Sequence, residues 1–382
     1  MTQSIELASI ESLCLSVASG GTPSRQRDEY WSNGTIPWLK TGALKDCRIY
    51  DAEEKITAEG LAGSSAKIFP ANTILMAMYG DGKTITSLGI LKNELATNQA
   101  CCAMIADPVK CDYRYLYYSL MQHRHELLGL VVAGAQRNLS LGIIKRFNIT
   151  TFSLAKQQRI ASILSNYDDL IENNRRRIQL LEESARLLYK EWFVHLRFPG
   201  HEHVKIIDGV PEGWAREPLG ELLTLQRGFD LPTNDRIPGS VPIYASTGVN
   251  GFHNVAKVKG PGVVTGRSGS LGTVMYVAKD HWPLNTALWV KEFKKVTPII
   301  SVFILRALKL ENYNGGAAVP TLNRNDVHKI EVLCPPENLM REFDLQVTSL
   351  FEQVEKLQGY NKKLTQARDI LLPRLMNGEL TV

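Results

Sequence analysis

The 382-residue chain lacks several features that would assign it to a specialised class of protein. It has no run of about 18 uncharged apolar residues, which excludes an ordinary membrane-spanning helix. Residues 1–6 lack the basic start and apolar stretch of a signal peptide, so we expect a cytoplasmic protein with no membrane partner. The 6 cysteines form no C-x-x-C pair, which favours reduced thiols over a metal site or a disulfide framework.

The motifs of common enzyme classes are also missing. Gly82-Lys83-Thr84 resembles part of a P-loop, but Ala77 stands where that motif needs a glycine. The chain has no G-x-G-x-x-G at the start of a helix, no G-x-S-x-G and no Asn-Pro-Pro-aromatic quartet. His195, His201 and His203 have no fourth ligand at a suitable spacing, so we interpret them as exposed side chains near a linker. We therefore expect a non-catalytic chain without catalytic, cofactor-binding or metal-binding residues.

Composition and length favour a globular protein of two domains. The chain is 44% hydrophobic and 22% charged, as soluble domains are, and it is too long for one compact core. Lysine and arginine number 44 against 39 aspartate and glutamate residues. This small excess is compatible with a polyanionic partner but does not require one.

The chain repeats itself with a long period. A shift of 183 positions places Leu116 on Ile299 and Leu164 on Val347, and apolar character persists at helical and strand spacing around these positions. So long a period indicates two copies of a unit made of a domain and a helix. We expect a first domain at 1–153, a long helix at 154–197, a linker at 198–210, a second domain at 211–336, and a second long helix with a C-terminal tail at 337–382.

The segments before each helix are rich in glycine, proline, threonine, asparagine and β-branched residues. Turn signals such as Gly20-Gly21-Thr22-Pro23 separate short strand-like runs such as residues 73–78. The sequence therefore predicts two irregular, strand-rich domains of mixed α/β (α+β) class in tandem, each followed by a long helix.

Each predicted helix carries a stripe of apolar residues at alternating steps of four and three. A 3.5-residue repeat held over ten positions is typical of a coiled-coil seam. Because the chain must run out along one helix and return along the other, we expect an antiparallel pair; the alternative is that each helix packs only on its own domain. The predicted seam comprises Ile160, Leu164, Ile171, Asn174, Ile178, Leu181 and Leu188 in the first helix and Val347, Leu350, Val354, Leu357, Asn361, Leu364 and Leu371 in the second.

Polar and breaking residues interrupt this pattern at a few places. One asparagine lies in each seam, where a buried polar residue fixes register and partner. Gly359 and Pro373 predict that the second helix is the weaker or kinked one. The basic run Arg175-Arg176-Arg177 is off the seam, and either a solvated helix face or a contact with phosphate or an acidic partner explains it.

The loops of both domains carry side chains that suit nucleic acid. Arginine, asparagine and glutamine can read base edges, while lysine and hydroxyl side chains suit phosphate oxygens. For any one of these residues an ordinary turn or surface role is the alternative. The candidate DNA-binding residues are Thr22, Ser24, Arg25, Trp38, Lys40, Tyr79, Lys83, Asn98, Gln99, Arg137 and Asn138 in the first domain, and Arg227, Asn250, Arg267, Ser268, Asn285, Thr286, Asn323 and Arg324 in the second.

The layout and several local motifs resemble the specificity subunits of type I restriction-modification enzymes. The tandem order of domain and helix matches over essentially the full length. Residues 211–214 (Pro-Glu-Gly-Trp), followed by Leu219-Gly220-Glu221, resemble the start of a target-recognition domain in that family. Residues 20–23, Gln157-Gln158-Arg159-Ile160 and the C-terminal stretch 372–380 are similar to other family motifs. Residues 5–10 depart from the pattern, because the first domain lacks the Pro-Glu-Gly-Trp start.

The resemblance implies a function. Each domain would read one half of a bipartite target in double-stranded DNA, and a helix pair about 55 Å long would set the spacing of the half-sites. It also implies two modification (methyltransferase) subunits that dock on the helices and bind S-adenosylmethionine, and restriction subunits that cleave. This chain would itself carry no cofactor. The alternatives are a non-catalytic two-domain scaffold that binds only protein partners, and an enzyme whose active site the motifs do not reveal.

Overall fold

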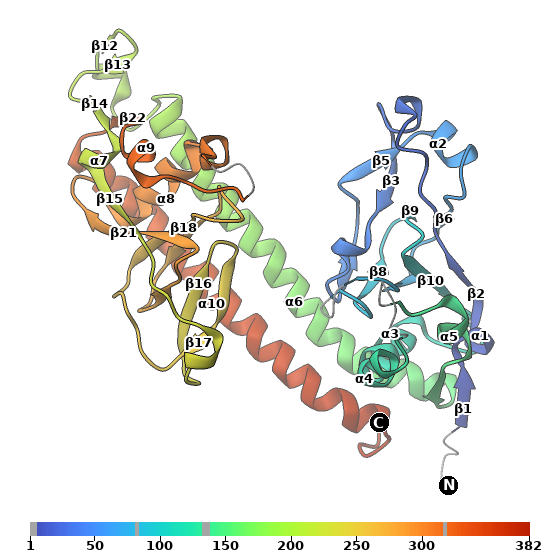
Figure 1. Ribbon diagram of the computed structural model, residues 1–382. Coiled ribbons are helices and arrows are strands. Elements are labelled where there is room, and N and C mark those ends of the chain that lie inside the picture. The colour runs from blue at the N-terminus through green and yellow to red at the C-terminus, as the bar shows by residue number, and fades with distance from the viewer. Residues whose placement is uncertain (1–5, 81–83, 132–137, 316–318) are drawn as a thin grey trace. The chain divides into compact units, whose positions relative to one another are not determined.

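The computed structural model describes residues 6–80, 84–131, 138–315 and 319–382 (Figure 1). The chain forms two compact units, unit 1 from Met1–Arg175 and Gln358–Val382, and unit 2 from Arg176–Leu357. The two longest helices, α6 (Leu154–Tyr189) and α10 (Glu337–Met376), each contribute one part to each unit. Each unit therefore combines a strand-rich domain with a segment of both long helices.

The remaining elements of unit 1 form domain 1. They are β1 (Glu6–Ser9), α1 (Ile10–Leu13), β2 (Cys14–Ser19), β3 (Ile36–Leu39), β4 (Cys47–Ile49), β5 (Glu54–Ile56), α2 (Ala58–Ala62), β6 (Ile68–Phe69), β7 (Ile74–Ala77), β8 (Leu88–Leu91), β9 (Leu95–Thr97), β10 (Cys101–Ala106), α3 (Tyr113–Gln122), α4 (Arg124–Gly129), α5 (Leu141–Arg146) and β11 (Asn148–Thr151).

The remaining elements of unit 2 form domain 2 and the segment that precedes it. They are a π-helical turn (Lys190–Val194), β12 (Ile206–Ile207), β13 (Val210–Pro211), β14 (Ala215–Pro218), α7 (Leu219–Leu222), β15 (Leu223–Arg227), β16 (Val241–Ala245), β17 (Gly248–His253), β18 (Gly262–Gly266), β19 (Val274–Val277), β20 (Trp282–Pro283), β21 (Ala287–Phe293), α8 (Pro298–Ala307), α9 (Arg324–His328) and β22 (Glu331–Cys334).

The sheets of the two domains share one topology. In domain 1 the main sheet has the order β2-β10-β7-β8-β4, and in domain 2 the order β15-β21-β18-β19 repeats its first four strands. A second sheet contains the parallel pair β3 and β9 in domain 1 and the parallel pair β16 and β20 in domain 2. The short antiparallel pairs β1–β11 and β14–β22 also correspond. The predicted tandem repeat of strand-rich mixed domains is confirmed.

The central strands form because their side chains are apolar on both faces. All four residues of β7 are fully buried, as is usual for a strand covered on both sides.

The helix that follows each main sheet begins after a residue whose side chain caps it. The side chain of Asp112 accepts backbone N–H bonds at the start of α3, and Thr297 does so at the start of α8, where Pro298 occupies the first turn.

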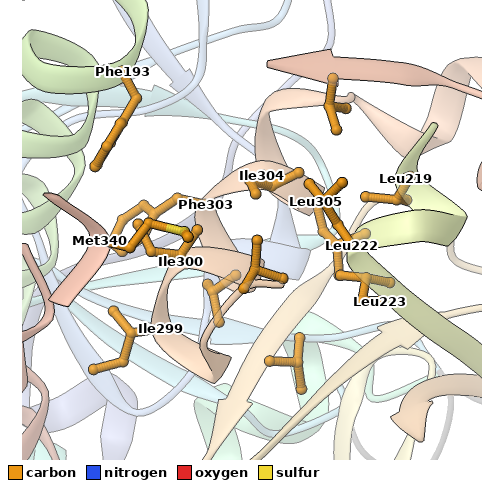
Figure 2. Packing of buried hydrophobic residues seen from close by; sticks show 14 of the residues in the cluster. Phe193, Leu219, Leu222, Leu223, Ile299, Ile300, Phe303, Ile304, Leu305 and Met340 are labelled. Carbon is orange, nitrogen blue, oxygen red and sulfur yellow. The ribbon is translucent and has the colours of Figure 1, made fainter. Parts of the chain in front are cut away.

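Unit 2 has one large hydrophobic core between domain 2 and the long helices (Figure 2). Ile300, Phe303 and Ile304 of α8 lie between α7 and the helix segments that carry Phe193 and Met340. Tyr189 stacks on Phe303 with ring centroids 5.0 Å apart. Burial of so many large apolar side chains, each contributing about 1.5–3 kcal/mol, fixes domain 2 on the helices of its own unit.

Within each unit, α6 and α10 run antiparallel and contact each other through the predicted seam. In unit 1, Asn174 donates from Nδ2 to Oδ1 of Asn361 over 2.9 Å, and Arg368 contacts Asp168 at 2.6 Å. In unit 2, the ring of Phe343 lies 5.7 Å from that of Trp192. Residue numbers fall along one helix as they rise along the other, as an antiparallel pair requires. All the predicted seam residues are buried or half-buried.

The helices also pack on their own domains, so the two predicted arrangements occur together. Ile160 and Leu164 of α6 and Leu372 and Leu375 of α10 belong to the core that α3 and the main sheet of domain 1 share. The seam residues thus connect the two helices, and the residues near the ends of the seam also pack on the domains.

Neither Gly359 nor Pro373 interrupts α10, which is helical from Glu337 to Met376. Pro373 lies in the last turn of α10. It has no backbone N–H to donate, but the loss of that hydrogen bond is tolerated there because the last turn of any helix already contains unpaired backbone groups. Helix α10 is therefore continuous across both residues. Among the residues that the structure describes, no helix combines the length and the apolar character needed to cross a bilayer.

Candidate nucleic-acid interface

The loops of domain 1 gather at the ends of β2, β9 and β7. The N–H of Gly21 donates to the carbonyl of Thr97 over 2.9 Å, and the N–H of Asn98 donates to Leu39 over 3.0 Å. A Cβ at Gly20 would lie 2.1 Å from the carbonyl oxygen of Thr97, so this close approach of two backbones requires glycine. The loop after β2 is thereby held against the loop that joins β9 to β10.

Domain 2 repeats this arrangement with different side chains. The N–H of Phe229 donates to the carbonyl of Pro283 over 2.8 Å, and the N–H of Leu284 donates to Tyr244 over 2.8 Å. A Cβ at Gly228 would lie 2.2 Å from the carbonyl oxygen of Leu284, so glycine is again required. The backbone contacts therefore align Gly20-Gly21 with Gly228-Phe229.

In both domains the same two loop positions bond to each other through their side chains. Thr22 donates its hydroxyl to Oε1 of Gln99 in domain 1, and Asn285 donates Nδ2 to Asp230 in domain 2. Gln99 and Asn285 occupy matching places in the loops before β10 and β21. A carboxamide, exposed on Gln99 and half-buried on Asn285, is thus fixed at the same point of each domain, and a carboxamide is the side chain that reads adenine bidentately.

Two further segments meet these two loops in each domain. The N–H of Leu139 donates to the carbonyl of Met78 over 2.9 Å, and Tyr79 forms an isolated bridge with Asn138. In domain 2 the N–H of Leu322 donates to Arg267 over 2.8 Å, and Ser268 forms the equivalent bridge with Thr321. Each domain therefore brings together four separate segments of the chain, here called the loop cluster of that domain.

An arginine lies beside the loop cluster of domain 1 in a cage of aromatic and acidic side chains. The guanidinium of Arg25 lies 3.6 Å from the ring centre of Trp31 and 2.5 Å from a carboxylate oxygen of Glu54. Lys40 also pairs with Glu54. Burial raises the pKa of Glu54, but the bonds from Lys40 and Arg25 outweigh it, and the pKa is lowered overall. The carboxylate stays ionised and holds both cations at the surface.

Trp38 is a correction to the predicted set. It is only 2% exposed, and its indole N–H donates to the carbonyl of Gly21 over 2.9 Å. Its ring packs edge-on against Trp31 and belongs to a small core with Ile56 and Ala96. Trp38 therefore supports the loop after β2, and Arg25 lies nearer to the half-buried Trp31, at 3.6 Å from its ring centre, than to Trp38, at 5.0 Å.

The basic residues of domain 2 contact the same loop cluster. Arg227 lies 3.4 Å from Asp230, and Nη1 of Arg267 donates to the carbonyl of Asn285 over 3.2 Å. Thr286 accepts backbone bonds from Arg267 and Ser268 at its carbonyl. Four predicted residues, Arg227, Arg267, Ser268 and Thr286, are thus brought around Asn285.

Other predicted residues lie elsewhere or have local roles. Asn250 is on β17 and accepts bonds from Arg236, and no contact in the described part of the chain joins it to Asn285. Asn323 caps α9, and Arg324 is the exposed first residue of that helix. In domain 1, the carbonyl of Ser24 accepts the indole N–H of Trp31. Lys83 and Arg137 lie outside the described residues.

Sequence reasoning missed Asp230, Trp31 and Glu54, each of which holds a predicted residue in place. Asp230 could have been found from its position in the turn after β15, matching Thr22 after β2. Across the described ranges, no three histidine, cysteine, aspartate or glutamate side chains gather as a metal site would require. The loop clusters offer instead amides, hydroxyls and cations, which suit bases and phosphates.

Comparison with known proteins gives one consistent family. Residues 5–183 match the family model described as the type I restriction modification DNA specificity domain. The chain is 28% identical to the type I restriction enzyme MjaIX specificity subunit of Methanocaldococcus jannaschii, over 96% of this chain and 91% of that protein. It is 23% identical to the EcoprrI specificity subunit of Escherichia coli, over 83% of this chain and 80% of that protein.

The solved structures agree with this result at the level of the fold. The chain is similar to the crystal structure of a type I restriction-modification S subunit from M. genitalium, with a TM-score of 0.59 and 19% identity. The match covers 98% of this chain and 96% of that one. The arrangement of two strand-rich domains and two long helices is therefore shared along the whole chain.

Proposed function

We propose that this chain is a specificity subunit of a type I restriction-modification system, and that each of its strand-rich domains reads one half of a bipartite target in double-stranded DNA. The observation that carries the proposal is the duplicated loop cluster, in which Gln99 and Asn285 occupy matching places on two domains of one topology. Their surroundings differ, since Thr22 bonds to Gln99 and Asp230 to Asn285. Different side chains on equivalent loops would read different base pairs.

The proposal also gives a role to the basic residues around each loop cluster, which is to contact phosphates. In domain 1, Arg25 and Lys40 pair with Glu54, and in domain 2, Arg227 contacts Asp230 and Arg267 contacts the backbone of Asn285. They would contact phosphates and fix the register of each domain on the duplex. Such contacts add affinity without sequence preference and weaken as salt rises.

The long helices would set the distance between the two half-sites. Helix α6 has 36 residues and no break, which corresponds to about 54 Å. The proposed target therefore has two half-sites separated by base pairs that the chain does not read. The helices would also dock two modification (methyltransferase) subunits, and restriction subunits would join that assembly.

The chemistry would belong to those partners. S-adenosylmethionine would bind to the modification subunits, and this chain would act in the cytoplasm as a non-catalytic, sequence-reading component without a cofactor. The described residues of the loop clusters support this division, because amide, hydroxyl and cationic side chains suit the bases and phosphates of nucleic acid.

A competition experiment tests the proposal. The chain, purified with its modification subunits, should retain a duplex that carries its methylated sequence about 1,000-fold or more over a scrambled duplex at moderate salt. Gln99→Ala and Asn285→Ala should each weaken specific binding by about five- to 150-fold and leave binding to scrambled DNA unchanged. Asn377→Ala, at an exposed position beyond α10, is the matched control. Equal retention of both duplexes would support a scaffold that binds only proteins.

A further inference from the structure

A cavity of about 200 Å³ lies in unit 1 where domain 1 meets the long helices. Its walls come from the segment around β4, from the end of β8, from α3, and from α6 and α10. Neither loop cluster contributes to it. The cavity is therefore a site separate from the proposed DNA-reading loops.

The walls of the cavity carry more cations than acids. Its cationic side chains are Lys45, Arg48, Lys92, Arg114, Arg175 and Arg368, and the acidic ones are Asp46, Asp168 and Glu172. Several of the arginines have close partners, since Arg48 pairs with Asp169, Arg114 with Asp112 at 2.8 Å, and Arg368 with Asp168 at 2.6 Å. The remaining positive charge is concentrated on the lysines and on Arg175, whose nearest carboxylate oxygen, on Glu172, is 3.8 Å away.

Lys92 is the half-buried cation without a partner. Among the described residues no carboxylate lies within 4 Å of its ammonium group, and Asp169 is already bound by Arg48. Burial lowers the pKa of Lys92, and the neighbouring charges of Arg48 and Arg114 lower it further. A half-buried ammonium among arginines is unfavourable unless an anion compensates it.

Tyr117 adds a polar group at the same place. The residue is 2% exposed and lies against the ring of Tyr118, whose own hydroxyl donates to Asp168 over 2.5 Å. Tyr117 lines the cavity, and no hydrogen bond of its hydroxyl is found among the described residues. Tyr117 thus supplies a donor to the cavity from its buried wall.

We propose that this cavity binds phosphate, either as a free ion or as the phosphate group of a larger molecule, with Lys92 and Tyr117 as its principal ligands. Lys92 supplies the charge and Tyr117 a hydroxyl donor, while Arg114 and Arg175 contribute positive potential. A volume of about 200 Å³ holds one tetrahedral oxyanion with a few waters, since a water takes about 30 Å³.

Titration calorimetry on the full chain, with inorganic phosphate at constant ionic strength, tests the proposal. Saturation at one phosphate per chain is expected. Lys92→Met should weaken binding about tenfold or more, and Tyr117→Phe, which changes one atom and preserves packing, about three- to tenfold. Lys67→Met, which removes an exposed lysine of the same domain, should leave the affinity unchanged. Absence of saturation, or equal weakening by all three variants, would overturn the assignment.

Two further binding measurements, one with a short DNA duplex and one with acetate, identify the source of the phosphate and test whether the cavity prefers phosphate to a carboxylate. If a short duplex competes with inorganic phosphate one for one, the ligand is a nucleic-acid phosphate, and if it does not, the ligand is a small oxyanion. Acetate that binds as tightly as phosphate would contradict the proposal, because the cavity would then be a carboxylate site. DNA discrimination by the same variants is measured separately, so a failure here is distinguishable from a failure of the proposed function.

Discussion

At the residue scale, the paired asparagines form a polar contact inside the helix seam. Asn174 and Asn361 are half-buried and satisfy each other across 2.9 Å. Their positions in the seam could be predicted from the 3.5-residue spacing alone. Their bond could also be anticipated, because an antiparallel pair with these steps brings the two interruptions close together.

We expect the two asparagines to be strongly coupled in stability. Asn174→Leu alone should destabilise unit 1 by about 1–3 kcal/mol, because the amide of Asn361 is left without a partner. The double variant Asn174→Leu/Asn361→Leu should recover most of that loss. Urea unfolding of the wild type, the two single variants and the double variant measures the coupling. Asn173→Leu on the exposed face of α6 is the control. If the stability losses of the two single variants add in the double variant, the hydrogen bond between Asn174 and Asn361 does not form.

A buried histidine in domain 2 makes stability depend on pH. His281 is fully buried, its Nδ1 bonds to the carbonyl of Lys279 over 3.0 Å, and burial lowers its pKa below the usual 6.5. The fold thus favours the neutral ring. This contribution to stability is present above pH 6.5 and is lost as the pH falls through the lowered pKa.

The urea midpoint of the wild type should therefore fall between pH 7.5 and pH 5 more than that of His281→Asn, which keeps a donor but does not titrate. His203→Asn removes a histidine with an 84% exposed side chain and should behave as the wild type. The same acid sensitivity in wild type and His281→Asn would contradict this account.

Residues in the loop clusters show where sequence reasoning fails. The bond between Thr22 and Gln99 joins positions 77 residues apart, and no periodic pattern in irregular loops predicts such a contact. Trp38 was predicted to bind DNA, but it lies in β3, where both Trp38 and Leu39 are buried on opposite faces of the strand. Burial in a short strand beside a glycine-rich loop is decided by tertiary packing.

At the scale of the elements, the long helices were the most predictable part of the chain. Helix α6 begins at Leu154 and α10 at Glu337, the residues at which the two long-helix segments were predicted to begin. Pro373 did not end α10, since a proline in the last turn removes one hydrogen bond near groups that are unpaired in any case. The strands could be placed only roughly, because each is short and turn residues lie on both sides.

If the helices set the half-site spacing, a matched insertion in both should lengthen it. We predict that seven residues placed after Arg175 in α6 and after Leu357 in α10, where the units meet, preserve the seam and widen the unread gap by about three base pairs. Methylation mapping in cells measures the number of unread base pairs between the two half-sites. A four-residue insertion is the control, because it shifts the phase of the seam. A methylated target with an unchanged gap would contradict this role.

At the scale of the whole molecule, the account depends on two domains of one topology that act independently. The tandem repeat was visible in the sequence as a shift of apolar positions, and the strand orders of the two main sheets confirm it. The DNA target itself could not be predicted, because irregular loops follow no code that relates residues to bases. Each domain has its own core and its own loop cluster, so each should read its half-site without the other.

Exchange of one domain tests this claim most directly. Residues 1–153 are replaced by the corresponding domain of another specificity subunit, and methylated sites are mapped in cells that carry the same modification subunits. The account predicts that one half of the target changes while the other half and the gap between them stay the same. A change in both halves, or in neither, would contradict it.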